Sequence, residues 1–167
     1  LLDLFQFHGY GMFIAGKFHG DMHPGNIILK DGNYYFVDTG YIGTVGDKIR
    51  KNLFSFFEAL SAYDYDACAQ FLRRMSEVAI EEDAYQEFRK KFLDLYHDFK
   101  GKTVSEVSLT RQMMNTIKLG VHNGMEFGQG VFPVIRSLMY LDGMVLRCRP
   151  QAVLLEDMRQ YILRFKK

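Results

Sequence analysis

The chain has 167 residues, with 21 basic and 20 acidic side chains and a formal net charge of +1, so it lacks the basic footprint that nucleic-acid binding requires. Hydrophobic residues make up 48% of it and charged residues 25%, values typical of a folded domain and not of a disordered segment. Cys68 and Cys148 lie far apart without metal-type spacing, which indicates no disulfide framework and fits a reducing compartment. No apolar run approaches the roughly 18 residues of a membrane span, and nothing resembles a signal peptide.

An apolar segment opens the chain. Over residues 1–16 the apolar side chains lie nearly all round a predicted helix, which favours a well-buried element. Gly9-Tyr10-Gly11 lacks both the spacing and the preceding strand of a nucleotide-binding glycine loop. We therefore interpret these glycines as positions of tight helix packing.

A single short β-hairpin is predicted next. Strand-type runs at residues 27–29 and 34–37 flank Asp31-Gly32, a strong hairpin-turn signal. Asn26 enters this hairpin and Asp38 leaves it, so the turn brings them side by side; a register shifted by one residue would set them directly opposite. With Asp31 and Gly32 as the turn residues, the facing pairs are Lys30 and Asn33, Ile27 and Phe36, and Asn26 and Val37.

From residue 47 onward the pattern is helical. Apolar residues recur at helical spacing and predict a core shared by several helices. Glycines between residues 120 and 130 indicate a loop before the last two helices. The predicted helices begin at Asp47 as a cap and at Asp64 or Asp66, cover 81–99 and about 109–119, and end with two opened by Pro133 and Pro150.

The strongest functional signal is the segment Phe18-His19-Gly20-Asp21-Met22-His23-Pro24-Gly25-Asn26, followed twelve residues after Asn26 by Asp38-Thr39-Gly40. The hairpin makes the oxygens of Asn26 and Asp38 converge, as a small hard cation such as Mg²⁺ prefers. Asp21 lies in a bent loop that can turn its carboxylate toward the same point. There it can accept or orient the proton of an attacking hydroxyl, while His23 can donate to a phosphate oxygen.

The spacing H-x-D-x-x-x-x-N followed by D-x-G is that of the protein-kinase catalytic set, and the chain resembles that superfamily. Two branches share motifs similar to F-H-G-D-M-H-P-G-N-I. They are the UbiB (AarF-type) atypical kinases associated with ubiquinone biosynthesis and the aminoglycoside and choline phosphotransferases. In the second branch a bulky residue such as Trp usually follows the metal-binding Asp. Here Gly40 stands two places after Asp38 and Ile42-Gly43 follows, which is similar to the UbiB pattern. Thr39 replaces the common Phe, which removes the basis for a Phe-driven loop switch.

The resemblance implies an α+β, mainly α-helical fold, the carboxy-terminal lobe of a protein kinase-like domain. The single domain would span residues 1–167, with the catalytic loop and hairpin at 18–43 and a helical scaffold at 47–167. The Lys that clamps the nucleotide phosphates and its acidic partner precede the catalytic loop in such chains, and neither is identifiable here. We therefore expect a longer enzyme whose amino-terminal lobe is missing from this sequence, and little turnover by these residues alone.

The resemblance also implies roles for individual residues. Asp21 takes the role of the catalytic-loop Asp, and His23 stands where many protein kinases place a Lys that touches the transferred phosphate. Asn26 and Asp38 become the ligands of Mg²⁺ and the residues that hold ATP. His19 corresponds to the structural His of the loop. The implied partners are the nucleotide and components of quinone or lipid metabolism at a membrane surface. The expected location is the cytoplasm, with membrane association through parts outside this chain.

Three other interpretations stay open. The chain can be a small-molecule phosphotransferase of the aminoglycoside or choline kinase type, or a truncated, non-catalytic lobe that acts as a binding module. His19-x-Asp21-x-His23 can also be a transition-metal site as in metal-dependent hydrolases, although Pro24-Gly25 would end the required strand at once. Taken singly, Asp21 or Asn26 is an ordinary cap or turn residue, and only the combined spacing favours a phosphate-handling site.

Overall fold

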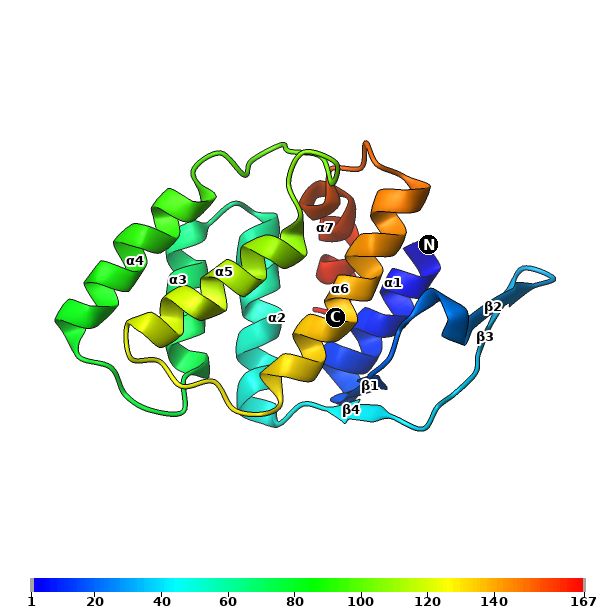
Figure 1. Ribbon diagram of the computed structural model, residues 1–167, viewed down its shortest axis with the longest axis horizontal. Helices are drawn as coiled ribbons and strands as arrows, with labels where there is room; N and C mark the ends of the chain where they lie inside the picture. Colours follow the sequence, from blue (N-terminus) through cyan, green and yellow to red (C-terminus); the bar gives the residue numbers. More distant parts are fainter. Residues whose placement is uncertain (1, 167) are drawn as a thin grey trace.

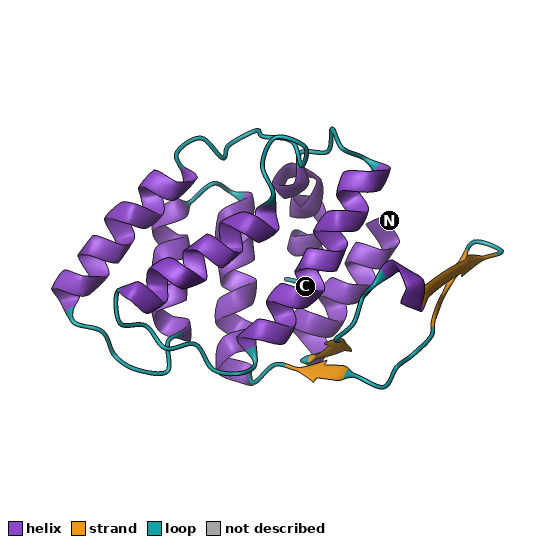
Figure 2. Cartoon of the chain, in the orientation of Figure 1, coloured by secondary structure: helices purple, strands orange, loops and turns teal. Residues whose placement is uncertain are grey.

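Helices dominate the computed structural model, which describes residues 2–166 (Figures 1 and 2). Leu1 and Lys167, the two ends of the predicted domain, lie outside the described residues. The strands are short and form two separate antiparallel pairs, β1 with β4 and β2 with β3. The predicted fold class, α+β and mainly α-helical, is confirmed.

The helices and strands are joined by connections of up to twelve residues. In chain order they are α1 (Leu2–Gly9), a π-helix η1 (Tyr10–Ala15), β1 (Lys17–His19), a 3-10 turn η2 (Pro24–Asn26), β2 (Ile27–Lys30), β3 (Asn33–Phe36), β4 (Ile42–Thr44), α2 (Asp47–Ser61), α3 (Tyr65–Met75), α4 (Glu82–Tyr96), α5 (Leu109–His122), α6 (Val131–Cys148) and α7 (Leu154–Arg164). Figure 1 shows α2 in the middle of the molecule, with the β2–β3 hairpin projecting from the end that carries α1 and α6.

Aromatic side chains fill the centre of the helical body. Phe88, Phe92 and Tyr96 lie one turn apart on α4 and are fully buried, and the centroids of successive rings are 5.7 and 4.7 Å apart. Phe56 and Phe57 on α2 are equally buried. Complete burial of one such side chain stabilises the fold by roughly 1.5–3 kcal/mol. The apolar helical spacing in the sequence therefore corresponds to a packed aromatic core.

The opening helix departs from the predicted buried element. One face of it stays partly open, because Phe7, Tyr10 and Ile14 are 55%, 56% and 38% exposed, although the Phe7 ring stacks on Phe36 of the hairpin with 4.8 Å between ring centroids. The glycines do mark close packing, as predicted. A Cβ atom on Gly9 would lie 2.9 Å from the ring of Phe165, and one on Gly11 would lie 2.7 Å from the carbonyl oxygen of Lys17.

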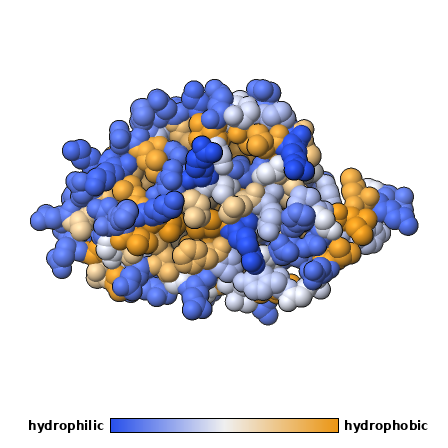
Figure 3. Space-filling model, in the orientation of Figure 1, coloured by the Kyte–Doolittle hydropathy of each residue, from blue (hydrophilic) through white to orange (hydrophobic). Residues whose placement is uncertain are grey.

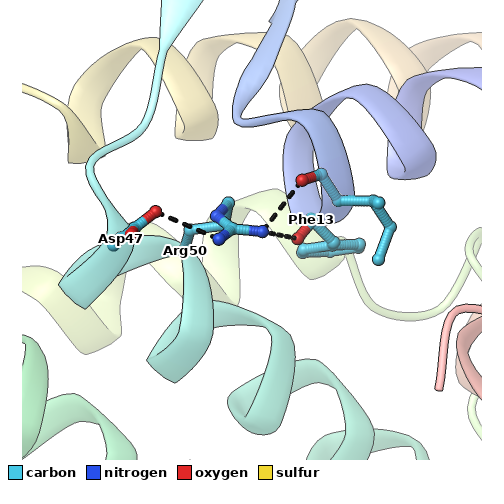
Figure 4. A network of polar contacts seen from close by, with 4 residues as sticks. Phe13, Asp47 and Arg50 are labelled. Atoms are coloured by element: carbon cyan, nitrogen blue, oxygen red, sulfur yellow. Dashed lines mark hydrogen bonds and ion pairs between the residues drawn. The ribbon is translucent and has the colours of Figure 1, made fainter.

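Arg50 joins the start of α2 to the end of this first helix (Figure 4). Its guanidinium donates hydrogen bonds of 3.0 and 2.9 Å to the carbonyl oxygens of Phe13 and Ile14, and it pairs with the carboxylate of Asp47 at 3.0 Å. The last carbonyls of a helix lack partners within the helix, so a cation is favourable there. This contact fixes η1, which precedes β1, against α2, which follows β4.

The hairpin has the predicted register. Ile27 pairs with Phe36 and Lys30 with Asn33. Asp31 and Gly32 form the turn with φ values of 51° and 75°, the left-handed conformations that a type I′ turn requires. Figure 3 shows hydrophobic surface over this hairpin next to a hydrophilic tip. The exposed apolar side chains on the hairpin itself are Ile28, Leu29 and Tyr35.

The pairing of β1 with β4 was not predicted, since a strand of three residues has no recognisable period. Phe18 pairs with Gly43, where a Cβ atom would lie 2.5 Å from the Phe18 ring. Just beyond the pair, the N–H of Gly20 donates to the carbonyl oxygen of Tyr41 at 2.9 Å. These contacts join the beginning of the Asp21 loop to the end of the Asp38 loop.

Two predicted helix starts need correction. Asp47 is not the cap of α2: Gly46 holds that position, and the carboxylate of Asp47 pairs with Arg50 instead. Pro150 does not open α7, which begins at Leu154, because residues 150–152 form a turn hydrogen-bonded to residues 104 and 105.

The other helix signals agree with the structure. Asp64 caps α3 by accepting from the N–H of Ala67 at 3.0 Å, and Pro133 lies in the first turn of α6.

Candidate active site

His19 sets the first bend of the site. It ends β1, is 6% exposed, and its Nδ1 accepts a hydrogen bond of 3.2 Å from the backbone N–H of Asp21. An imidazole nitrogen that accepts carries no proton, so the proton of neutral His19 resides on Nε2. The side chain thus holds the loop at Asp21 and has the structural role expected for it.

Asp21 and Asn26 are in direct contact. The Nδ2 of Asn26 donates to the Oδ2 of Asp21 at 3.0 Å and to its backbone oxygen at 3.1 Å. The 3-10 turn makes this contact possible, because Pro24 starts a single tight turn in which the N–H of Asn26 donates to the carbonyl of His23 at 2.8 Å. With its amide nitrogen engaged, Asn26 keeps its Oδ1 as a free acceptor among the described residues.

Asp38 follows the residue that pairs with Asn26. The N–H of Val37 donates to the backbone oxygen of Asn26 at 2.9 Å, so Asp38 leaves the hairpin where Asn26 enters it. Its φ is 53°, a left-handed conformation that is uncommon outside glycine and is found at sites that hold a group in a fixed direction. A Cβ atom at Gly40 would lie 3.3 Å from the Oδ1 of Asp38. A side chain at position 40 would therefore crowd the carboxylate.

The donor set fits a magnesium ion. Mg²⁺ in proteins takes one or two carboxylates together with phosphate oxygens and water, and it favours hard oxygen ligands. The Asp38 carboxylate is exposed and has no hydrogen bond or ion pair within residues 2–166, and the Asn26 Oδ1 is similarly available. Over the same residues, no group of three or more His, Cys, Asp or Glu side chains is placed to hold a metal. The strand that a transition-metal site would need ends at His19.

His23 lies on the side of the loop that faces α6. Its Nδ1 accepts from the N–H of Gly25 at 3.1 Å, and its ring packs edge-on against Tyr140, with the ring centroids 5.5 Å apart. The His23 ring makes no hydrogen bond with Asp21, Asn26 or Asp38; only its backbone carbonyl accepts, from the N–H of Asn26. Because Nδ1 accepts, the proton of the neutral ring is on Nε2, which remains able to donate. Its phosphate contact stays a prediction.

Arg136 is a site residue that sequence reasoning missed. From α6 it donates a 2.9 Å hydrogen bond to the carbonyl oxygen of Gly20, and its guanidinium carbon lies 4.7 Å from the centre of the Tyr41 ring. The sequence gives no signal for this role, since an Arg on an amphipathic helix is normally a solvated residue. Only the fold brings residues 116 positions apart into contact.

A pocket of about 270 Å³ lies behind the two loops. His8, His19 and Thr39 are among the residues that line it. His8 is buried and bonded through Nε2 to the hydroxyl of Ser137. Burial, and then the nearby His19, lower the pKa of His8 from 6.5 to about 4, so its imidazole is neutral at pH 7.

The mainly helical body with its short antiparallel strand pairs is consistent with a kinase-like fold. Residues 2–72 match the family described as the ABC1 atypical kinase-like domain. The probable protein kinase UbiB of Pasteurella multocida (strain Pm70) is 24% identical over 162 residues, which cover 90% of this chain and 29% of that protein. The probable protein kinase UbiB of Cronobacter sakazakii (strain ATCC BAA-894) is also 24% identical over 162 residues, 90% of this chain and 28% of the relative.

A third relative is named as an uncharacterized protein in the hydrogenase 1 5' region of Clostridium pasteurianum, 16% identical over 153 residues, 90% of this chain and 28% of the relative. No solved structure matches. The matches confirm the predicted resemblance: by sequence, the chain is a relative of the UbiB-type atypical kinases. It spans about 29% of the length of the first of these curated relatives. Within residues 2–166, no helix combines the length and the apolar character that crossing a membrane requires.

Proposed function

We propose that this chain carries the catalytic and metal-binding loops of a UbiB-like kinase or ATPase that uses MgATP. The observation that carries the proposal is the coupling of Asp21 to Asn26 beside Asp38. One amide donates to the expected catalytic carboxylate and its oxygen remains free, while the backbone hydrogen bond from Val37 to Asn26 brings the backbone of Asp38 to the same end of the hairpin. That arrangement suits a reaction in which one group orients a nucleophile while two others hold a metal on phosphate oxygens.

Asp21 would act on the attacking hydroxyl or water. The hydrogen bond from Asn26 engages Oδ2 at 3.0 Å and leaves the other carboxylate oxygen to orient the nucleophile and accept its proton. Asn26 Oδ1 and the Asp38 carboxylate would hold Mg²⁺, which supplies charge neutralisation on the ATP phosphates when bound. His23, with a donor at Nε2, would contact a phosphate oxygen.

We extend the proposal to the biological role on the family resemblance. A UbiB-like enzyme would support quinone or lipid metabolism at a membrane surface, with the nucleotide as its immediate partner. Thr39, Gly40 and Gly43 support this branch over the aminoglycoside and choline phosphotransferases. The phosphoryl acceptor can be a protein, a small molecule or water, and the proposal does not depend on which it is.

The test compares two aspartates of the same hairpin region in the full-length protein. Asp38 and Asp31 both have left-handed φ values, 53° and 51°, which Asn also tolerates, so Asp38→Asn and Asp31→Asn impose the same chemical change on similar backbones. We expect Asp38→Asn to weaken magnesium-dependent ATP binding at least tenfold by calorimetric titration, and Asp31→Asn to leave it within twofold. Equal binding by the two variants would refute the metal role of Asp38.

Turnover is measured in the same preparations. Asp21→Asn should lower the rate of ATP turnover by about 10²–10⁴-fold, the usual contribution of a positioned acid–base group, while the affinity for MgATP stays near that of the wild type. Full turnover in this variant would exclude the catalytic role. If the wild-type protein binds MgATP but no acceptor condition gives turnover, the chain belongs to a binding module.

A further inference from the structure

Helix α6 lies against the catalytic loop at two points. Arg136 donates to the carbonyl oxygen of Gly20 at 2.9 Å, one residue before Asp21. One helical turn later, the Tyr140 ring packs edge-on against His23, two residues after Asp21, with 5.5 Å between ring centroids. The loop that carries the proposed catalytic carboxylate is therefore supported on both sides of Asp21 by one helix.

Tyr41 connects this contact to the metal-binding loop. It follows Asp38-Thr39-Gly40 directly, and its carbonyl oxygen accepts from the N–H of Gly20 at 2.9 Å. Its ring lies so close to Gly20 that a Cβ atom there would come within 2.0 Å of a ring carbon. The guanidinium of Arg136 stacks over the same ring, 4.7 Å from its centre. One cation thus touches a backbone atom of one loop and an aromatic side chain of the other.

The contact of Arg136 with both loops matters because the segment between Asp38 and α2 is short. Only residues 39–46 separate Asp38 from the start of α2, and three of them form β4. Helix α6 lies next to both loops. The guanidinium of Arg136 contacts Gly20 in the first loop and the ring of Tyr41 in the second.

We propose that Arg136 is a positioning residue that holds the Asp21 loop and the Asp38 loop in a fixed relation. It acts through Gly20 and Tyr41 and does not touch the reacting atoms. Its value for catalysis rests on the proposed function above, because the two loops it joins are the proposed catalytic and metal-binding loops. Displacing a reacting group by about 1 Å can cost about a hundredfold in rate, so a rigid link of this kind affects turnover more than binding.

The test uses Arg136→Met in the full-length protein, with Arg147→Met as the matched control. Arg147 is exposed in the last turn of the same helix and has no hydrogen bond or ion pair within residues 2–166. The first measurement is amide hydrogen exchange, which does not depend on any activity. We expect Arg136→Met to speed exchange at Gly20–Asn26 and Asp38–Tyr41 at least tenfold, with no change in α2 to α5, and Arg147→Met to change neither loop.

The second measurement is steady-state kinetics. Arg136→Met should lower kcat for ATP turnover about tenfold or more while the Kd for MgATP stays within twofold. Tyr41→Leu should do the same, and the double variant should be no worse than either single one, because both remove the same link. Arg136→Lys should recover only part of the rate, since an ammonium cannot both stack on the ring and reach the carbonyl in the same way.

Each outcome decides the proposal. Unchanged exchange in both loops overturns it, whatever the kinetics show. The proposal is also overturned if kcat and the number of MgATP binding sites fall equally and exchange becomes faster throughout the helices. Arg136 would then only stabilise the fold. Faster exchange confined to the loops supports the link even if the wild-type protein neither binds nor turns over MgATP. In that case the proposed function fails while the positioning role stands.

Discussion

The helical body and the loop region from β1 to β4 are ordered by different means. The body is held by complete burial, with Phe57 and Phe92 at 0% exposure. In the loop region Leu29 is 65% exposed. Phe18 and Met22 are buried there, but Asp21, Asn26 and Gly20 are located mainly by hydrogen bonds of 2.8 to 3.2 Å. Each such bond contributes only about 1 kcal/mol, against several for a buried ring.

This difference separates stability from function within one small chain. A substitution in the body should unfold the protein, whereas one in the loops should leave it folded and displace a functional group. Regions with few buried contacts are also the ones that open locally at low free energy. We therefore expect the candidate site to depend more than the helical body on single contacts such as that of Arg136 with Gly20.

The largest expected effect tests the body. Phe57→Ala removes a fully buried ring whose centroid lies 5.6 Å from that of Phe13 and 5.5 Å from that of Phe56. The lost packing and the cavity left behind should lower the free energy of unfolding by about 3–5 kcal/mol, measured by urea denaturation. Tyr35→Ala in the hairpin, where the ring is 51% exposed, is the matched control and should cost under about 1 kcal/mol. Similar losses in the two variants would remove the distinction between the regions.

The sequence predicted the body and the hairpin because both rest on local patterns. Apolar spacing located the helices after residue 47, and Asp31-Gly32 specified both the turn and the register of β2 with β3. The first helix was harder, since its apolar residues all round predicted full burial. Phe7 and Tyr10 nevertheless stay more than half exposed, although the Phe7 ring stacks on Phe36 of the hairpin.

The candidate site was predictable only in its residue types and spacing. The contact between Asn26 and Asp21 needs the 3-10 turn at Pro24, and the pairing of β1 with β4 needs strands too short to show a period. The role of Arg136 could not be predicted, because a helical pattern does not indicate which surface side chain will contact a loop that is distant in the sequence. Local signals thus predict elements, while the relation between elements comes from the fold.

A smaller effect tests a buried polar contact of the helical body that borders the loop region. His8 on α1 bonds to Ser137 on α6, and its ring packs edge-on against Phe18 on β1. His8 takes up a proton near pH 4 in the fold and near 6.5 when unfolded. Between these values the unfolded state binds more protons, so the contribution is complete above about pH 6.5 and is lost as the pH falls toward 4. The shift corresponds to about 3 kcal/mol at most.

Urea denaturation at pH 7 and pH 4.5 measures this contribution. The wild type should lose about 2–3 kcal/mol more between the two pH values than His8→Gln, which has no titrating ring at this position. His122→Gln, on the exposed surface of α5, is the matched control and should follow the wild type. Parallel losses in the wild type and in His8→Gln would show that His8 is not held neutral by burial.

The smallest effect concerns the exposed apolar surface of the hairpin. Leu29 is 65% exposed and lies opposite Tyr34 on β3, so Leu29→Thr removes little buried area and keeps a residue that favours strands. Thermal and urea unfolding of the full-length protein should change by under about 0.5 kcal/mol, the usual range for a surface substitution. Leu72→Thr, at a buried position of α3, provides the contrast and should cost several times more. A loss above about 1.5 kcal/mol for Leu29→Thr would show that the apolar side of the hairpin is covered in the full-length protein. Burial would then help to order the hairpin. The difference between the helical body and the loop region would hold only for residues 2–166 taken alone.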